Sequence, residues 1–310
     1  MAIALLFPGQ ASQFPGMGKD LYDAFDVARR TFEEASEALD KDVGNLCFRG
    51  TEEELRLTEN TQPAIFTVSV AAFRVLSAET GLRVACAAGH SLGEYSALVA
   101  AGALSLGDAV RVLRLRGKYM QEAVPVGEGA MAAILGLSPE KVAEVCRRAS
   151  ALGVVSPANF NGGDQVVISG ATKAVSAACD AARAAGAKRA LPLPVSAPFH
   201  CALMRPAADR LAPELRAIPQ GEFRFPVVAN VTAAPYREGD AVAESLVRQV
   251  VAPVLWEESI LAMRSMGPTS FLEVGPGKVL SGLVRRIDKE ASTAAFCGPA
   301  DLDAARSLPS

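Results

Sequence analysis

The chain has 310 residues, of which 50% are hydrophobic and 21% are charged. This is long enough for one large domain or two modest ones, and it excludes a disulfide-held mini-protein or a disordered chain. The 31 basic and 34 acidic residues give a formal net charge of -3. Proteins bind nucleic acid largely through Lys and Arg side chains, which neutralise phosphates and release their counterions. This chain has no excess of basic residues, which argues against nucleic acid as its main partner.

The first predicted element is a buried strand over residues 3–7. The N-terminal run MAIALLFPGQ has no charged n-region and is interrupted by Pro8 and Gly9, so we expect neither a signal peptide nor a membrane span. The six cysteines include no C-x-x-C pair, and there are only two histidines. We therefore expect a cytoplasmic protein with reduced thiols and no metal centre.

Short apolar runs alternate with longer segments of helical periodicity, which is typical of an α/β fold with a parallel sheet. A helix is predicted to begin at Thr61, with the Thr61 hydroxyl as its cap and Pro63 in its first turn. Further buried strands are predicted over Val84–Ala88, Val227–Val231 and Phe271–Val274.

Between Gly129 and Ser196 the pattern changes to strand, helix, strand, strand, helix, strand. This βαββαβ order is that of the ferredoxin-like split unit. We therefore predict a small ferredoxin-like subdomain over residues 129–196, inserted into a larger α/β subdomain formed by residues 1–128 and 197–310. The residues from about Ala300 onward are predicted to form a weakly ordered tail.

The segment Gly89–Gly93 reads Gly-His-Ser-Leu-Gly and matches the pattern G-x-S-x-G. A strand is predicted before it and a helix after it, which is the context of a nucleophile elbow. A serine at such a turn is exposed beside the unpaired N–H groups of the helix N-terminus, which can stabilise an oxyanion. Ser91 is therefore the candidate nucleophile; the alternative is a glycine-rich turn in which Ser91 only caps the helix.

A serine hydroxyl needs a base to become an effective nucleophile, and histidine is the usual one. His90 is adjacent to Ser91, and neighbouring side chains at a turn generally diverge. His200 is therefore the candidate general base, and a structural histidine is the alternative. It lies where the predicted small subdomain returns to the large one, a place where sites tend to form.

The residues alone do not identify the group that orients His200. Asp209 is the nearest acidic residue in sequence, and Asp164 or Asp180 could approach in space. A backbone carbonyl could also fix the imidazole tautomer.

Four segments occur together in the order FPGQASQFPGMG, GHSLGEYSALVAAG, LPLPVSAPFH and EVGPGKVL. With RLRGKYMQEAVP and LVRQ they span nearly the whole chain, which resembles the malonyl-CoA:acyl carrier protein transacylases. The resemblance implies an α/β-hydrolase-like large subdomain with a parallel sheet and an inserted ferredoxin-like small subdomain. It also implies a monomer that moves malonyl from malonyl-CoA to the phosphopantetheine thiol of holo acyl carrier protein, without metal or redox cofactor, for fatty acid biosynthesis.

The resemblance also assigns roles to residues of the site. Ser91 takes the malonyl group, and His200 acts first as base and then as acid. The main-chain carbonyl of Gln249 stands where an aspartate would orient His200. Backbone N–H groups of Gln10 and Leu92 form the oxyanion hole.

Arg116 matches the family arginine that holds the malonyl carboxylate, since a guanidinium offers a two-pronged fit to a carboxylate. Without the resemblance, Arg116 reads as a helix-face residue in a surface ion pair. Phe199 stands where related modular polyketide acyltransferases have Phe with malonyl and Ser with methylmalonyl, because the ring would crowd an α-methyl group; ordinary packing is the alternative. Ala11 stands where the family commonly has Gly.

An acidic carrier protein would dock on basic residues at the mouth of the cleft. The candidates are Lys188, Arg189, Arg285 and Arg286, which could equally form a solvated face. Three other functions stay open: a general serine esterase, a trans-acting malonyl acyltransferase that loads polyketide synthase carrier proteins, and a non-catalytic interaction protein of the same fold.

Overall fold

The computed structural model describes residues 2–195, 197–237 and 241–308. The chain forms two compact units, the first from Met1–Gly117, Ile218–Asp240 and Ser259–Ser310 and the second from Lys118–Ala217 and Ala241–Glu258. The second unit extends beyond the predicted 129–196 range on both sides. Ser196 and Ser310, which end two of the predicted ranges, lie outside the described residues.

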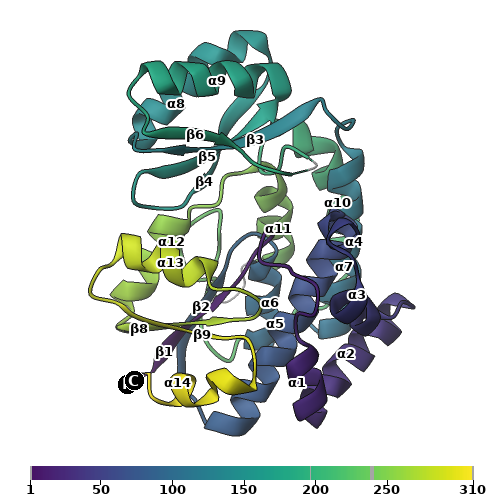
Figure 1. Ribbon diagram of the computed structural model, residues 1–310. Helices are drawn as coiled ribbons and strands as arrows, with labels where there is room; N and C mark the ends of the chain where they lie inside the picture. The colour runs from purple at the N-terminus through teal and green to yellow at the C-terminus, as the bar shows by residue number, and fades with distance from the viewer. Residues whose placement is uncertain (1, 196, 238–240, 309–310) are drawn as a thin grey trace. The chain divides into compact units, whose positions relative to one another are not determined.

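A five-stranded parallel sheet forms the centre of the first unit, in the order β7-β2-β1-β8-β9 (Figure 1). The strands are β1 (Ile3–Phe7), β2 (Val84–Gly89), β7 (Val227–Val228), β8 (Ser270–Val274) and β9 (Ser292–Phe296). β1 is apolar throughout because it is fully buried between β2 and β8. The predicted parallel sheet is confirmed, but β7 is shorter than predicted because the chain turns directly after it, with Ala233 N–H bonded to Ala229 O at 2.9 Å.

Helices connect and follow these strands along the chain. They are α1 (Lys19–Ala24), α2 (Asp26–Leu39), α3 (Val43–Arg49), α4 (Glu52–Arg56), α5 (Thr58–Thr80), α6 (Gly93–Ala101), α7 (Leu106–Glu122), α12 (Trp256–Ser265), α13 (Val279–Ile287) and α14 (Leu302–Arg306). The α7 and α12 helices each run from one unit into the other. Most of α5 is buried because it contacts α6 and β8 and is covered by α2.

Two predictions about the first unit are wrong, one about the start of a helix and one about the C-terminal segment. The helix predicted to begin at Thr61 begins at Thr58, and the Thr61 hydroxyl donates to Leu57 O at 3.0 Å instead of capping an N–H group. Instead of a weakly ordered tail from about Ala300, residues 299–306 form η3 (Pro299–Asp301) and α14. They are held because Ala305 is buried and Arg306 Nη2 donates to Glu79 O at 3.0 Å.

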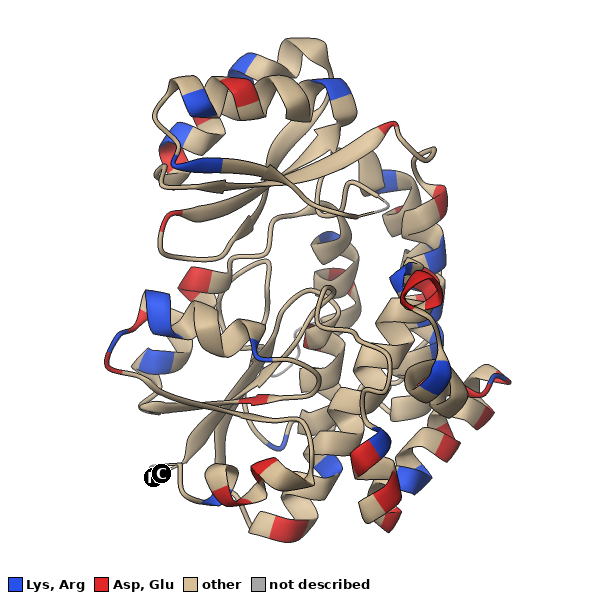
Figure 2. Cartoon of the chain, viewed as in Figure 1, with Lys and Arg blue, Asp and Glu red and all other residues tan. Residues whose placement is uncertain are grey.

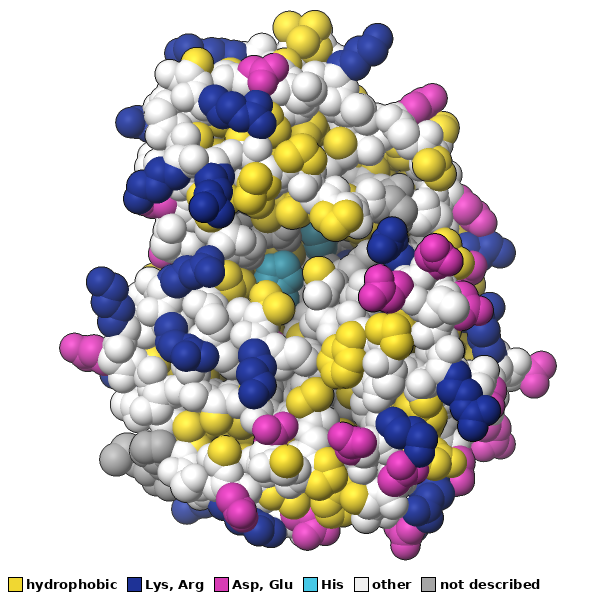
Figure 3. Space-filling model, viewed as in Figure 1, with side chains coloured by type: hydrophobic (Ala, Val, Ile, Leu, Met, Phe, Trp, Pro, Cys, Tyr) yellow, Lys and Arg dark blue, Asp and Glu magenta, His cyan; other side chains and the backbone are white. Residues whose placement is uncertain are grey.

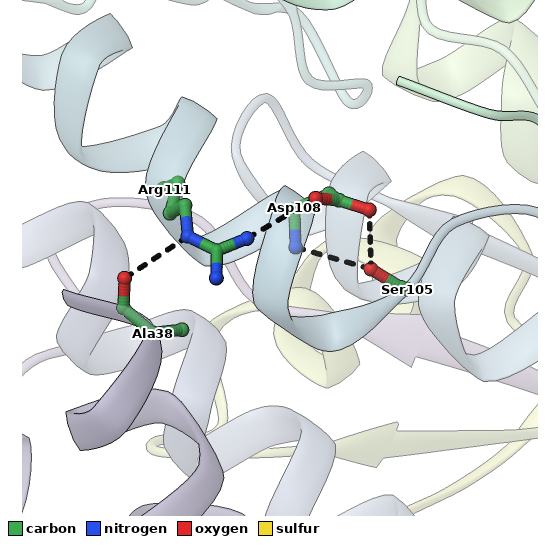
Figure 4. A network of polar contacts seen from close by, with 4 residues as sticks. All are labelled: Ala38, Ser105, Asp108 and Arg111. Carbon is green, nitrogen blue, oxygen red and sulfur yellow. Dashed lines mark hydrogen bonds and ion pairs between the residues drawn. The ribbon is translucent and has the colours of Figure 1, made fainter.

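Charged residues of the first unit lie mainly on its helices, and its strands carry few (Figure 2). One polar network fixes the start of α7, the helix that carries Arg116 (Figure 4). Ser105 Oγ accepts the Asp108 N–H at 3.1 Å, which caps the helix, and donates to Asp108 Oδ2 at 2.7 Å. Arg111 bonds both Asp108 and Ala38 O, so α7 is tied to the end of α2.

The second unit contains a four-stranded antiparallel sheet in the order β4-β5-β3-β6, with α8 and α9 on one face (Figure 1). Its elements are β3 (Gly129–Leu135), α8 (Pro139–Ala149), η1 (Ser150–Leu152), β4 (Val155–Phe160), β5 (Gln165–Ala171), α9 (Thr172–Ala184) and β6 (Arg189–Pro192). The predicted ferredoxin-like βαββαβ order is confirmed.

Two more helices belong to the second unit, α10 (Arg205–Arg216) and α11 (Val242–Val251). They pack on each other, and the short η2 (Ala202–Met204) contacts both of them and β5. This packing is why the second unit is larger than the ferredoxin-like block alone.

Within the described ranges, no helix combines the length and apolarity needed to cross a membrane. The same residues include no group of three or more His, Cys, Asp and Glu arranged to hold a metal ion.

Candidate active site

The turn between β2 and α6 is a sharp elbow. Ser91 has a φ of 53°, a left-handed conformation uncommon outside glycine. A Cβ on Gly89 would lie 1.9 Å from the backbone of Gly93, and a Cβ on Gly93 would lie 2.2 Å from Phe7 O. Close backbone packing therefore requires both glycines, and the predicted strand–turn–helix arrangement is confirmed.

The guanidinium of Arg116 lies beside the Ser91 hydroxyl. Nη2 donates to Ser91 Oγ at 3.1 Å, and Nη1 donates to Gln62 Oε1 at 2.8 Å. Arg116 is only 1% exposed, which excludes the surface ion pair, and its carbon Cζ is 5.8 Å from the centre of the Tyr95 ring. Burial lowers the pKa of Arg116, while the nearby Tyr95 and Glu94 act to raise it. The first unit thus holds a buried cation against its candidate nucleophile.

Sequence reasoning did not single out Gln62, although its amide orients Arg116. Gln62 is 1% exposed and lies on α5. In the sequence, Gln62 stands out only as a polar residue within an apolar helical segment. Such a residue can form hydrogen bonds with many kinds of partner, so its position alone does not point to Arg116.

Changing Gln62 to glutamate is expected to weaken malonyl-CoA binding. The variant keeps the shape of the side chain but puts a carboxylate on Arg116, where it would compete with the malonyl carboxylate that the family resemblance assigns to Arg116. We expect KM for malonyl-CoA to rise roughly tenfold or more, equivalent to about 1.4 kcal/mol. Steady-state kinetics check this, and an unchanged KM would show that Arg116 does not meet the substrate carboxylate.

Of the two predicted oxyanion-hole residues, Leu92 lies at this elbow, and the chain just before Gln10 passes beside it. Phe7 of β1 pairs with Gly89 of β2, so the chain after β1 passes beside the turn, and a Cβ on Gly9 would be 2.6 Å from His90 O. Gln10 is the next residue along the chain after this close approach of Gly9 to His90. Leu92 directly precedes α6 and is 1% exposed, so its N–H belongs to the helix N-terminus.

Ala11, the residue that departs from the family pattern, has a φ of 80°. A left-handed conformation costs a non-glycine residue about 1–2 kcal/mol, and glycine loses about 0.5–1 kcal/mol more backbone entropy on folding. Ala11 is exposed, so its methyl group contributes little packing. We therefore expect Ala11→Gly to raise the free energy of unfolding by about 0.5–1 kcal/mol, measured by urea unfolding. A lower unfolding midpoint with an unchanged slope would contradict this reading.

His200 belongs to the second unit and is 4% exposed. Its Nδ1 lies 2.9 Å from the main-chain O of Gln249, a fully buried residue of α11. A carbonyl oxygen only accepts, so Nδ1 carries the hydrogen in the neutral imidazole and Nε2 is left as the acceptor. Of the acceptors that the sequence left open, the structure thus provides the backbone carbonyl. His200 also has a positive φ of 59°.

The two neighbours of His200 are buried. Phe199 is 7% exposed, and Cys201 is 1% exposed with its Sγ donating to Pro198 O at 3.1 Å. Burial raises the pKa of the Cys201 thiol, which keeps it protonated near neutral pH. A protonated, enclosed thiol is a poor nucleophile, so Cys201 does not compete with Ser91 for that role.

The basic docking candidates are all exposed. Lys188 and Arg189 lie at the start of β6 in the second unit, and Arg285 and Arg286 form the last turn of α13 in the first unit. In Figure 3, several Lys and Arg side chains gather over α13 and the loops beside it.

A serine at a nucleophile elbow is typical of acyl-transferring enzymes, and a histidine whose Nδ1 is held by a fixed acceptor is typical of their general base. The comparison with protein families agrees with this class, because residues 4–305 match the model described as the acyl transferase domain.

Among curated relatives, the malonyl CoA-acyl carrier protein transacylase of Escherichia coli K12 is 50% identical over 98% of this chain and 99% of its own length. The Bacillus subtilis 168 protein of the same name is 49% identical, covering 98% of this chain and 96% of its own. The crystal structure of an acyl-carrier-protein S-malonyltransferase from Burkholderia pseudomallei superposes with a TM-score of 0.96 at 46% identity, covering 99% and 100% of the two chains. This chain therefore belongs to the acyl transferase family, among its malonyl CoA-acyl carrier protein transacylases. The resemblance and the fold class inferred from the sequence are confirmed.

Proposed function

We propose that this protein transfers the malonyl group from malonyl-CoA to the phosphopantetheine thiol of a holo acyl carrier protein through a malonyl-Ser91 intermediate. The observation that carries the proposal is the buried guanidinium of Arg116, 3.1 Å from Ser91 Oγ. An always-charged, two-pronged donor at that position selects acyl groups that end in a carboxylate. The names of the relatives at about half identity support the same substrate pair.

In the first half-reaction, Ser91 Oγ attacks the thioester carbonyl of malonyl-CoA while His200 Nε2 takes the hydroxyl proton. The N–H groups of Gln10 and Leu92 stabilise the negative charge on the carbonyl oxygen of the tetrahedral intermediate. As this intermediate collapses, the bond to sulfur breaks, and His200 returns the proton to the CoA thiolate. The product is a malonyl ester of Ser91.

The second half-reaction reverses these steps with a different thiol. His200 takes the proton of the carrier thiol, the sulfur attacks the malonyl ester, and the same donors hold the oxyanion. The bond to Ser91 Oγ then breaks, and His200 returns the proton to Ser91. Every step is an acyl or proton transfer, so the reaction uses no metal or redox cofactor.

The surrounding residues fit this role. The bulky ring of Phe199 disfavours an α-methyl group, which supports malonyl over methylmalonyl. The exposed pairs Lys188–Arg189 and Arg285–Arg286 offer positive charge to an acidic carrier protein. The enzyme acts as a cytoplasmic monomer that supplies fatty acid biosynthesis.

A second candidate is a malonyl acyltransferase that loads polyketide carrier proteins. A solved complex of a type II PKS acyl-carrier protein with its malonyl-transacylase favours it, because that structure shares 49% identity and a TM-score of 0.95 with this chain. The similarity covers 98% of this chain. The two candidate functions share the same active-site chemistry and differ in the carrier protein that receives the malonyl group.

The test uses malonyl-enzyme freed of malonyl-CoA and then mixed with holo fatty acid carrier, holo polyketide carrier, apo carrier or buffer alone. Intact masses follow both proteins with time. We expect malonyl to move to holo carriers and not to the apo carrier, and faster to the fatty acid carrier. Faster loading of the polyketide carrier would favour the second candidate, whereas loss of malonyl at one rate in all four mixtures would identify a hydrolase.

A further inference from the structure

The side chain of Asn230 spans the two ends of the elbow. Asn230 follows β7 and is fully buried. Its Oδ1 accepts the N–H of Ser91 at 2.8 Å, and its Nδ2 donates to Gly89 O at 2.7 Å. One amide therefore holds the main chain both before and at the candidate nucleophile.

Asn230 is itself fixed by Glu94, in the first turn of α6. The main-chain N–H of Asn230 donates to Glu94 Oε2 at 3.1 Å, and the Tyr236 hydroxyl donates to Glu94 Oε1 at 2.6 Å. Glu94 is fully buried, and a negative side chain is favourable at a helix N-terminus. The helix that begins at the elbow thus holds the loop that carries Asn230.

These contacts have a consequence for the backbone of Ser91. A residue keeps a positive φ such as 53° only where its surroundings over-determine it. The bond from Ser91 N–H to Asn230 supplies that constraint and also engages the Ser91 N–H. The N–H of Leu92, the next residue, is then the elbow donor left to face a developing oxyanion.

We propose that Asn230 is a positioning residue for the acyl transfer, holding Ser91 Oγ and the Leu92 N–H in their reactive arrangement without touching the substrate. The inference rests on the proposed function, because its effect appears in the rate of serine acylation. It also applies to any electrophile that Ser91 attacks, since Asn230 acts on the geometry of the elbow and not on the malonyl group.

The first arm compares Asn230→Ala with Asn60→Ala in single-turnover malonylation, followed by quenching and intact mass. Asn60 is a matched control, because it is also buried and bonded through its side chain, to Glu54 O and Lys41 Nζ, but makes none of the elbow contacts. We expect Asn230→Ala to lower the maximal acylation rate roughly ten- to hundredfold. The malonyl-CoA concentration that gives half of the maximal rate should stay nearly unchanged. Asn60→Ala is expected to lower thermal stability and keep the acylation rate within about twofold.

The second arm uses Asn230→Asp and pH, and remains informative if the alanine variant does not fold. An ionised aspartate accepts from Ser91 N–H but cannot donate to Gly89 O, whereas a protonated aspartate can do both. Burial raises the pKa of a carboxyl group, so the ratio of variant to wild-type rates is expected to rise as pH falls from about 8 to about 5.5. A ratio independent of pH would contradict the bridging role.

A third arm separates this inference from the proposed function. Phenylmethanesulfonyl fluoride labels a reactive serine without any malonyl group, and its rate depends on the same elbow. If wild type reacts with this reagent but not with malonyl-CoA, the proposed substrate is wrong, and the variants still test Asn230 with the reagent. Equal labelling rates for wild type and a folded Asn230→Ala would overturn the inference.

Discussion

Replacing His200 with alanine is expected to lower malonyl transfer about 10⁴-fold or more, the loss typical of removing the base from a serine–histidine pair. Without the imidazole, Ser91 must attack as an un-ionised hydroxyl, and the departing thiolate receives no proton. The hydrogen bond of Nδ1 to Gln249 O fixes the tautomer in which Nε2 accepts, so this one nitrogen serves both half-reactions.

Quenched-flow mass spectrometry would measure the His200→Ala rate of malonyl-Ser91 formation, with circular dichroism to confirm the fold. Cys201→Ser is the control, because it changes a neighbouring buried residue outside the proposed machinery. We expect that variant to remain within about threefold of wild type. A His200→Ala rate within about tenfold of wild type would mean that another group accepts the serine proton.

Replacing Arg116 with alanine is expected to reduce malonylation roughly hundredfold or more, because losing one partner of a buried charge pair costs about 3–5 kcal/mol. Acetyl-CoA has no carboxylate, so its slow reaction should fall much less, and the preference for malonyl over acetyl should collapse. We also expect the malonyl ester, once formed, to hydrolyse faster, since Arg116 no longer turns the acyl group away from water.

Arg116→Lys separates charge from geometry. Lysine keeps the positive charge but offers a point charge in place of the guanidinium fork that bonds both Ser91 and Gln62. We expect an intermediate malonylation rate with partial selectivity, from competition assays with equal malonyl-CoA and acetyl-CoA. If Arg116→Ala kept the full malonyl preference, the selectivity would come from another residue.

Local patterns predicted much of this molecule. The fully apolar sequence of β1 is typical of a buried parallel strand, and the G-x-S-x-G pattern is typical of a tight turn between a strand and a helix. Each of these local patterns is compatible with few other structures, so both elements could be predicted. The ferredoxin-like order followed from periodicity alone. The weaker predictions concerned the ends of elements. Thr61 looked like a cap, but its hydroxyl donates back to Leu57 O, just before α5 begins, and the chain after Ala300 is held by the bond from Arg306 to distant Glu79.

The missing parts of the candidate site are contacts between segments far apart in sequence. Gln62 lies 54 positions from Arg116, and Asn230 lies 139 positions from Ser91. Neither amide has a recognisable local pattern, because a buried polar residue shows its purpose only when its hydrogen-bond partners are known. The choice of Gln249 over an aspartate likewise depended on the family resemblance, since a main-chain carbonyl exists at every residue.

The most direct test of the central claim is the intact mass of the protein after brief exposure to malonyl-CoA, with acetyl-CoA, methylmalonyl-CoA and Ser91→Ala in parallel. We predict one malonyl group on the wild-type chain and none on Ser91→Ala, with little or no adduct from the other two donors. A malonyl adduct that persists in Ser91→Ala, or the absence of both adduct and free CoA with wild type, would contradict the account.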